Sequence, residues 1–222
     1  MKTTLSALSV CLITICSASA SVEIKLDFTQ TGGSYTPGWD PVYANFLADT
    51  PTASITDIDG LGLNFGFNHV AVYDNGNATE SLTRSGFYTY QNDTLDHSFT
   101  LSGLGVGSTV TLYACAAWDG NGRGGYVFFG DSGASGVQAQ TVGDPGTSGT
   151  VANLTRIGSL VVDGSGVASG ALFGAGGIGT PTEGQVGGFI FEIEPASVPE
   201  PTTLALSVLG LGGWMVSRRR SA

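Results

Sequence analysis

The chain has 222 residues, which is enough for one domain of ordinary size, and it carries 35 glycines and a formal net charge of −10. Between residues 21 and 199, four Lys and Arg residues stand against seventeen Asp and Glu residues. This balance argues against a nucleic-acid partner, because phosphate neutralisation requires clustered Lys and Arg.

The first twenty residues predict a signal helix that directs export. Lys2 precedes an apolar run over residues 5–16, and the segment ends in the cleavage-site pattern Ala-Ser-Ala at Ala20. Cleavage there leaves Cys115 as the one cysteine of the exported chain, so no internal disulfide is expected. Cys115 lies in an alternating strand pattern and is predicted to be a small buried residue rather than a reactive thiol.

Residues 21–194 predict an all-β domain. Apolar and polar residues alternate in "VEIKLDF" (22–28) and again in "GGFIFEIE" (187–194), which is the pattern of a strand with one face in a core. Eight further segments of this kind, separated by Gly, Asn, Asp or Ser, cover residues 67–73, 86–90, 95–101, 108–118, 125–130, 137–142, 157–163 and 166–174. Ten closely spaced strands predict an antiparallel β-sandwich.

A β-solenoid is the alternative fold. The glycine-rich run over residues 163–179 would suit its tight corners, but the sequence has no repeat of fixed period. The sandwich is therefore the main prediction.

The stretch from 95 to 118 suggests a particular kind of sandwich. It joins two predicted strands through "SGLGVGS", and this hairpin resembles those of jelly-roll and fibronectin-like extracellular modules. The plan of residues 21–194 is similar to the galactose-binding-like jelly rolls of bacterial surface proteins. That resemblance implies that the first and last strands, 22–28 and 187–194, lie side by side.

Residues for hydrolytic catalysis are few. His69 and His97 each share a strand face with apolar residues, so both are expected to be hydrogen-bonded core histidines. The sequence has no nucleophile elbow, no zinc-protease helix motif and no phosphate loop. We therefore predict a protein that is not an enzyme.

A carboxylate-based polysaccharide-degrading enzyme is the alternative function, since such an enzyme needs two Asp or Glu side chains across a sugar. Most carboxylates of this chain lie in turns beside glycine, where backbone conformation already explains them.

The same turns offer candidate calcium ligands. Asp57 and Asp59 in "DIDG", Asp74 in "DNGN" and Asp119 in "DGNG" supply oxygens at alternate positions, as loop-borne Ca²⁺ sites do. None of them completes an EF-hand pattern. A structural Ca²⁺ is the one cofactor considered, as an alternative to plain turn chemistry.

Two tryptophans suggest a carbohydrate-binding surface, because exposed indole rings stack on sugars while polar groups hold the hydroxyls. Trp39 lies in the Pro/Gly-rich loop "YTPGWDP" and is expected to be exposed. Trp118, followed by Asp119 and Arg123, continues the apolar face of its strand, so burial is the expectation there. Extracellular polysaccharide is the partner that this surface would take.

The C-terminal segment combines a proline-rich motif, an apolar run and a basic end. The motif consists of Val198, Pro199, Glu200 and Pro201. The apolar run over 202–217 would form a helix about 24 Å long, somewhat short of the ~30 Å hydrocarbon core of a bilayer. Trp214 suits a membrane interface. The basic end, which suits the cytoplasmic side, consists of Arg218, Arg219 and Arg220. We expect a linker over 195–201, a transmembrane helix over 202–217 and a cytoplasmic tail over 218–222.

These three parts in order resemble the PEP-CTERM sorting signal of Gram-negative bacteria, which is also catalogued as the ice-binding protein C-terminal domain. The resemblance implies recognition by an exosortase while the helix is held in the inner membrane, and then delivery to the cell surface or the extracellular matrix. It implies no antifreeze activity. A simple C-terminal anchor is the alternative. The expected function is a structural or adhesive role outside the cell, with carbohydrate binding as one form of it.

Overall fold

The computed structural model describes residues 20–74, 85–89, 97–116, 125–133, 136–139, 151, 154–174 and 184–196. The predicted signal helix and the predicted transmembrane helix over 202–217 therefore lie outside the described residues. Within the described ranges, no helix has the length and apolar character needed to cross a membrane. These ranges hold β-strands and one short 3-10 helix, η1 (Gly130–Ser132).

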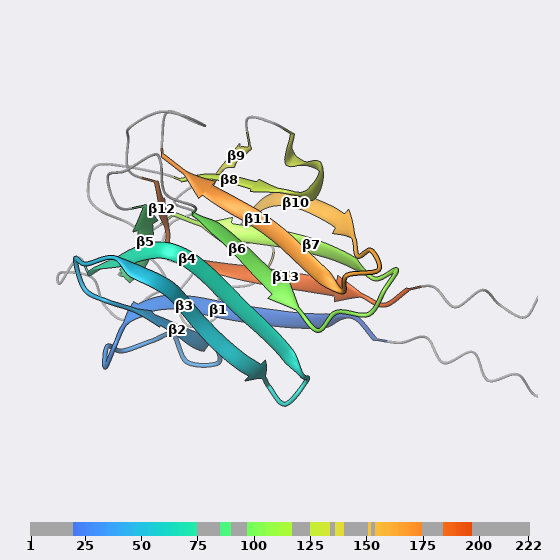
Figure 1. Ribbon diagram of the computed structural model, residues 1–222, viewed down its shortest axis with the longest axis horizontal. Coiled ribbons are helices and arrows are strands. Elements are labelled where there is room, and N and C mark those ends of the chain that lie inside the picture. Colours follow the sequence, from blue (N-terminus) through green and yellow to red (C-terminus); the bar gives the residue numbers. More distant parts are fainter. Residues whose placement is uncertain are drawn as a thin grey trace, which may run out of the picture. The chain divides into compact units, whose positions relative to one another are not determined.

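One sheet has five strands (Figure 1). Their order is β10 (Thr155–Val161), β7 (Thr109–Cys115), β13 (Gly188–Glu194), β1 (Val22–Gln30) and β2 (Asp40–Ala44). Neighbouring strands are antiparallel except β1 and β2, which are parallel. The pairing of β1 with β13 runs from Val22 opposite Ile193 to Asp27 opposite Gly188. The first and last strands thus lie side by side, which confirms the prediction.

The second sheet has eight strands, all paired antiparallel. Seven follow the order β12 (Gln185–Val186), β5 (Ser85–Thr89), β4 (Leu63–Asp74), β6 (Ser98–Ser102), β11 (Val167–Phe173), β8 (Tyr126–Phe129) and β9 (Val137–Gln138). The eighth, β3 (Thr50–Ile58), pairs with β4. Two sheets in which all pairs but β1 with β2 are antiparallel rule out the solenoid.

Phenylalanine rings from both sheets form the core between them. Phe28 of β1 stacks on Phe87 of β5 with ring centroids 4.4 Å apart. Phe189 of β13 lies 4.8 Å from Phe99 of β6. Alternation along each strand directs these rings inward, so burial of aromatic area holds the two sheets face to face.

All ten predicted segments contain a strand, but the sequence missed β2, β3 and β12. It also assigned "SGLGVGS" wrongly to a hairpin. This turn connects β6 in the eight-stranded sheet to β7 in the five-stranded sheet, so the two strands do not pair. The buried side chain of Leu104 and the hydrogen bond from Leu104 N to Gly166 O (3.1 Å) hold this turn beside the connection between β10 and β11, which also crosses between the sheets.

The two sheets also approach each other closely where β8 and η1 meet β10. A Cβ on Gly158 would clash with the carbonyl oxygen of Phe129, and a Cβ on Gly130 would clash with that of Ser159. Asp131 Oδ1 accepts a hydrogen bond from Ser159 N at 2.7 Å across this junction. The contact therefore requires glycine at both positions.

Candidate functional site

Trp39, the predicted sugar platform, is buried. Only 5% of its surface is exposed, and it packs with Cys115, Leu154 and Ile190 on the outer face of the five-stranded sheet. The expectation of an exposed ring is wrong because the loop after β1 folds back over this face. The other residues of the predicted ligand site, Trp118, Asp119 and Arg123, lie outside the described residues.

A buried carboxyl group fastens this loop. Asp27 Oδ2 accepts a hydrogen bond from Thr36 N at 2.6 Å, whereas Asp27 Oδ1 has no hydrogen-bond partner among the described residues. Burial raises the pKa of Asp27, although the Thr36 hydrogen bonding opposes the rise. The loop that carries Trp39 is thus held by a carboxyl group that is costly to ionise.

Cys115 lies near this carboxyl group. Gly188 separates the two across the sheet, because it pairs with Asp27 on β1 and with Cys115 on β7. Burial, with a further contribution from the charge of Asp27, raises the pKa of the Cys115 thiol to about 12. Cys115 is therefore a buried, unreactive residue, as predicted.

The turn between β3 and β4 explains two of the candidate calcium ligands by backbone geometry. Asp57 and Asp59 have positive φ angles of 53° and 51°. Asp57 Oδ1 accepts a hydrogen bond from Gly62 N at 2.9 Å, which closes the turn. The side chain of Asp74 and all of Asp119 lie outside the described residues. Over the described ranges, no group of three or more His, Cys, Asp or Glu residues is placed to hold a metal ion.

Asp40, at the start of β2, lies within electrostatic range of Asp59. Burial first, and the negative charge of Asp59 second, raise the pKa of Asp40. A carboxyl group with a raised pKa is one of the two that general acid catalysis on a glycosidic bond requires. This pair is the observation that bears on the enzyme alternative.

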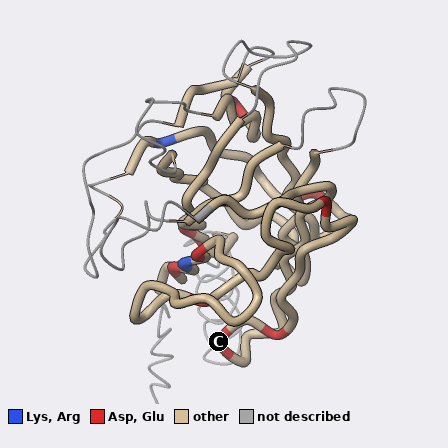
Figure 2. The backbone as a smooth tube through the Cα atoms, turned by 90° about the vertical axis from the view of Figure 1, so that its left-hand side faces the viewer, with Lys and Arg blue, Asp and Glu red and all other residues tan. Residues whose placement is uncertain are grey.

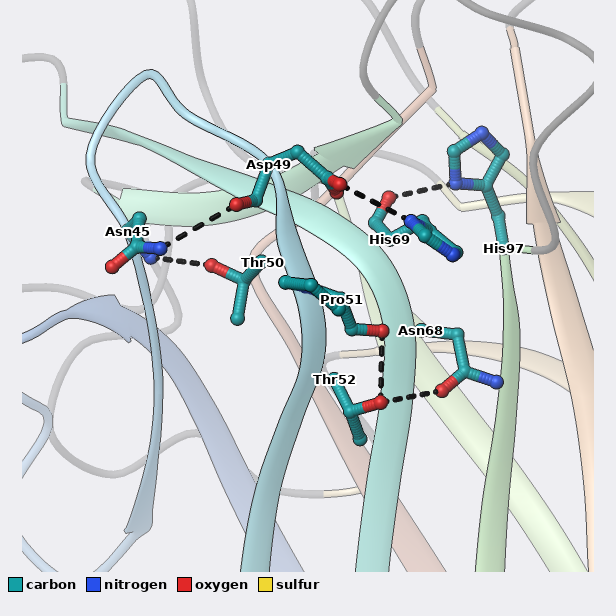
Figure 3. Close-up of polar contacts among 8 residues, drawn as sticks. All are labelled: Asn45, Asp49, Thr50, Pro51, Thr52, Asn68, His69 and His97. Carbon is teal, nitrogen blue, oxygen red and sulfur yellow. Dashed lines mark hydrogen bonds and ion pairs between the residues drawn. The ribbon is translucent and has the colours of Figure 1, made fainter.

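The two histidines differ from each other (Figure 3). His97 is 7% exposed, and its Nδ1–H donates to the carbonyl oxygen of His69 at 2.8 Å, so it is the hydrogen-bonded core histidine that was predicted. His69 is half-buried instead, with Nδ1 3.2 Å from Asp49 Oδ2. Its positive φ of 49° interrupts the alternation of β4 and turns the ring out of the core, so the prediction for His69 is wrong.

Three exposed aromatic residues escaped the sequence analysis. Tyr35, Tyr43 and Phe46 are 46%, 39% and 50% exposed. Tyr43 lies on the outward side of β2, between the buried Val42 and Ala44. Its signal was alternation in a strand that the sequence analysis did not recognise.

The comparison with protein families identifies a second kind of site, at the C-terminus. The family model for the PEP-CTERM protein-sorting motif matches residues 197–220. The chain carries a PEP-CTERM motif. No curated protein and no solved structure matches the chain. The all-β fold is confirmed, and the galactose-binding-like assignment stays a prediction.

The PEP-CTERM motif indicates an exported protein that an exosortase sorts. Its residues are those that the sequence singled out, from Val198 to Arg220, and they lie outside the described residues. Lys25 and Arg156 are the only Lys or Arg in the described ranges, and Figure 2 shows the sparse blue segments among the red acidic ones. The part of the chain that the motif delivers thus presents a predominantly acidic surface.

Proposed function

We propose that the exosortase delivers the β-domain to the cell surface or the extracellular matrix, where it has a structural or adhesive role without catalysis. The PEP-CTERM motif at 197–220 carries this proposal. Because prolines flank Glu200 on both sides, the sequence predicts an extended segment there that does not join a helix. The motif therefore suits a protease-like groove just outside the bilayer.

The domain is built so that processing at either end leaves its sheets intact. β1 begins two residues after the predicted cleavage at Ala20, and β13 ends at Glu194, before the motif. Neither cut removes a paired strand residue. This supports a domain that works after both flanking segments are gone.

Mass spectrometry of the surface form tests the proposal. We expect that the C-terminal peptide "VSRRRSA" is lost from the wild-type surface protein. The double variant Pro199→Ala/Pro201→Ala should keep this peptide and stay in the membrane fraction, because the segment before the apolar run is then free to become helical. Glu194→Ala, just upstream, serves as the control and should be processed normally. An intact "VSRRRSA" peptide on the wild-type surface form would contradict sorting by cleavage and favour the simple anchor.

A second candidate function is a polysaccharide-degrading enzyme, and the observation that favours it is the raised pKa of Asp40 near Asp59. If the pair were catalytic, the protein would release reducing ends from a polysaccharide and Asp40→Asn would abolish that release. Under the main proposal, neither the wild type nor Asp40→Asn releases more reducing ends than a heat-denatured sample does.

A further inference from the structure

The outer face of the eight-stranded sheet is free of charge over four neighbouring strands. Residues 52–56 of β3, 64–68 of β4, 98–102 of β6 and 167–171 of β11 lie in register and include no Asp, Glu, Lys or Arg. Their inward side chains belong to the core, and their outward side chains are mostly Ser, Thr and Asn. We call the outward side chains of these four segments the neutral face.

A row of free hydroxyl groups crosses the middle of the neutral face. Ser54 pairs with Gly66, Gly66 with Thr100, and Thr100 with Ser169. All three hydroxyl side chains are exposed, and none of them hydrogen-bonds to another described residue. Each hydroxyl can therefore donate to and accept from a ligand.

The neighbouring row is ordered by hydrogen bonds between side chains. The Thr52 hydroxyl lies within hydrogen-bonding distance of two acceptors, Pro51 O at 2.8 Å and Asn68 Oδ1 at 3.1 Å, and Asn68 Nδ2 donates to Ser98 Oγ at 3.2 Å. Figure 3 shows Thr52 and Asn68 pointing toward each other from β3 and β4. These bonds fix the side chain of Asn68 before any ligand arrives, which lowers the entropy cost of binding.

The chemistry of the neutral face selects among ligands. It has no cation to hold a polyanion, and the net charge of −10 opposes one further. Its outward side chains include no aromatic residue and no Arg, which supply most hot spots at protein interfaces. Strand spacings give the array dimensions of about 14 Å by about 13 Å. What fits is a neutral polymer that is itself covered with hydroxyl groups.

We propose that the neutral face binds a neutral polysaccharide through hydrogen bonds along its rows. The inference deepens the proposed function, on which it rests, by naming the ligand class and the surface of the adhesive role. Single contacts with exposed hydroxyls are weak, so retention arises from many contacts along one polymer and from many copies of the protein.

Cosedimentation with microcrystalline cellulose and with cross-linked dextran tests this inference. The full chain, kept in a polyoxyethylene detergent, should bind saturably to at least one of the two. Adding about 0.5 M NaCl should not weaken this binding, because no ion pair contributes. Alginate beads, which are anionic, should retain little protein.

Thr100→Arg places a bulky charge at the centre of the neutral face and should weaken binding about tenfold or more, because the guanidinium loses water without gaining a partner. The matched control is Thr109→Arg on the outward side of β7 in the other sheet, which should bind as the wild type does. A triple variant with alanine at 54, 100 and 169 removes the free hydroxyls without adding bulk, and we expect it to bind about fivefold more weakly.

Equal thermal unfolding of all variants shows that folding is not the cause of any loss. Absence of saturable binding to both neutral polysaccharides would overturn the inference, and so would equal losses in Thr100→Arg and Thr109→Arg. Neither result touches the C-terminal peptide, so the sorting proposal is judged separately by mass spectrometry.

Discussion

The outward surfaces of the two sheets are built from the same alternation but differ in chemistry. Across the five-stranded sheet, one row runs from Arg156 through Tyr113 and Ile190 to Lys25, and the next row contains Glu192 opposite Glu23. The neutral face has no charge at any corresponding position. Alternation explains which side chains are inside, but it does not explain this contrast.

Charge on an exposed sheet ordinarily keeps it soluble and unpaired. The five-stranded sheet follows that rule where its face is open and is covered by the Trp39 loop elsewhere. The neutral face has neither charge nor cover over the described residues. Solubility does not explain this neutral composition, so mutations should separate the contribution of the face to stability from its contribution to binding.

The largest effect is expected from the inward side of the strand that carries the neutral face. Phe99 on β6 has no exposed surface and lies 5.3 Å from Phe67, centroid to centroid. Phe99→Ala should lower the free energy of unfolding by about 4 kcal/mol, because it leaves a cavity between the sheets. Urea unfolding measures this. A loss below about 1 kcal/mol would mean that the sheets are not packed as described.

The next effect concerns the junction of the sheets. Gly158→Ala places a methyl group against the carbonyl oxygen of Phe129 and should cost about 2 to 3 kcal/mol in the same unfolding measurement. Gly164→Ala is the matched control, since a Cβ there meets nothing within 4 Å and the φ angle is not positive. Equal stabilities of the two variants would contradict the close approach.

A smaller effect on the unfolding free energy depends on pH, and its pH trend is opposite for the carboxyl groups of Asp27 and Asp163. The pKa of Asp27 is raised above its ordinary 3.8, so the folded state favours the protonated form. Its contribution is greatest below pH 3.8 and is lost as pH rises through the raised pKa. The unfolding free energy of the wild type minus that of Asp27→Asn should therefore fall from pH 3.8 upward.

Asp163 provides the comparison for this experiment. Hydrogen bonds from Ser165 lower its pKa, so its contribution is present above pH 3.8 and is lost as pH falls through the lowered pKa. The unfolding free energy of the wild type minus that of Asp163→Asn should thus rise as the pH increases from strongly acidic values toward 3.8. Equal pH trends for the two variants would show that Asp27 is not buried.

The smallest effect is expected on the neutral face itself. Thr100→Ala removes an exposed hydroxyl group that has no partner among the described residues, so stability should change by less than about 0.5 kcal/mol. Thermal unfolding of Thr100→Ala and Phe99→Ala, measured side by side, checks this at two adjacent residues of β6. A larger loss would mean that the hydroxyl serves the fold, which would remove the contrast between the two surfaces.

Three strands of the neutral face, β4, β6 and β11, were predicted from the sequence, whereas its fourth strand, β3, was missed. In Thr50–Ile58 the outward residues are Ser and Thr, and the inward series begins with the small Ala53. Such a segment is typical of a loop. Small residues on both faces of this segment, rather than the neutral composition that it shares with β6 and β11, hid β3 from the alternation pattern.

The errors in the candidate site came from contacts between distant residues. Trp39 is buried because Asp27 binds Thr36, and the placement of the loop over the sheet depends on that contact rather than on the loop's composition. His69 leaves the core because of one positive φ angle in β4. Cys115 was predicted correctly, since its strand alternation was a sufficient signal.

The pairing of β1 with β13 has a mechanical consequence. Their outer ends, Val22 and Ile193, are opposite each other, so a force that pulls the two chain ends apart would break one hydrogen-bonded pair after another, as in opening a zipper. A protein held through only one end avoids that loading direction. Attachment through one end, as the proposed sorting would give, would therefore spare the pairing of the terminal strands when drag acts on the molecule.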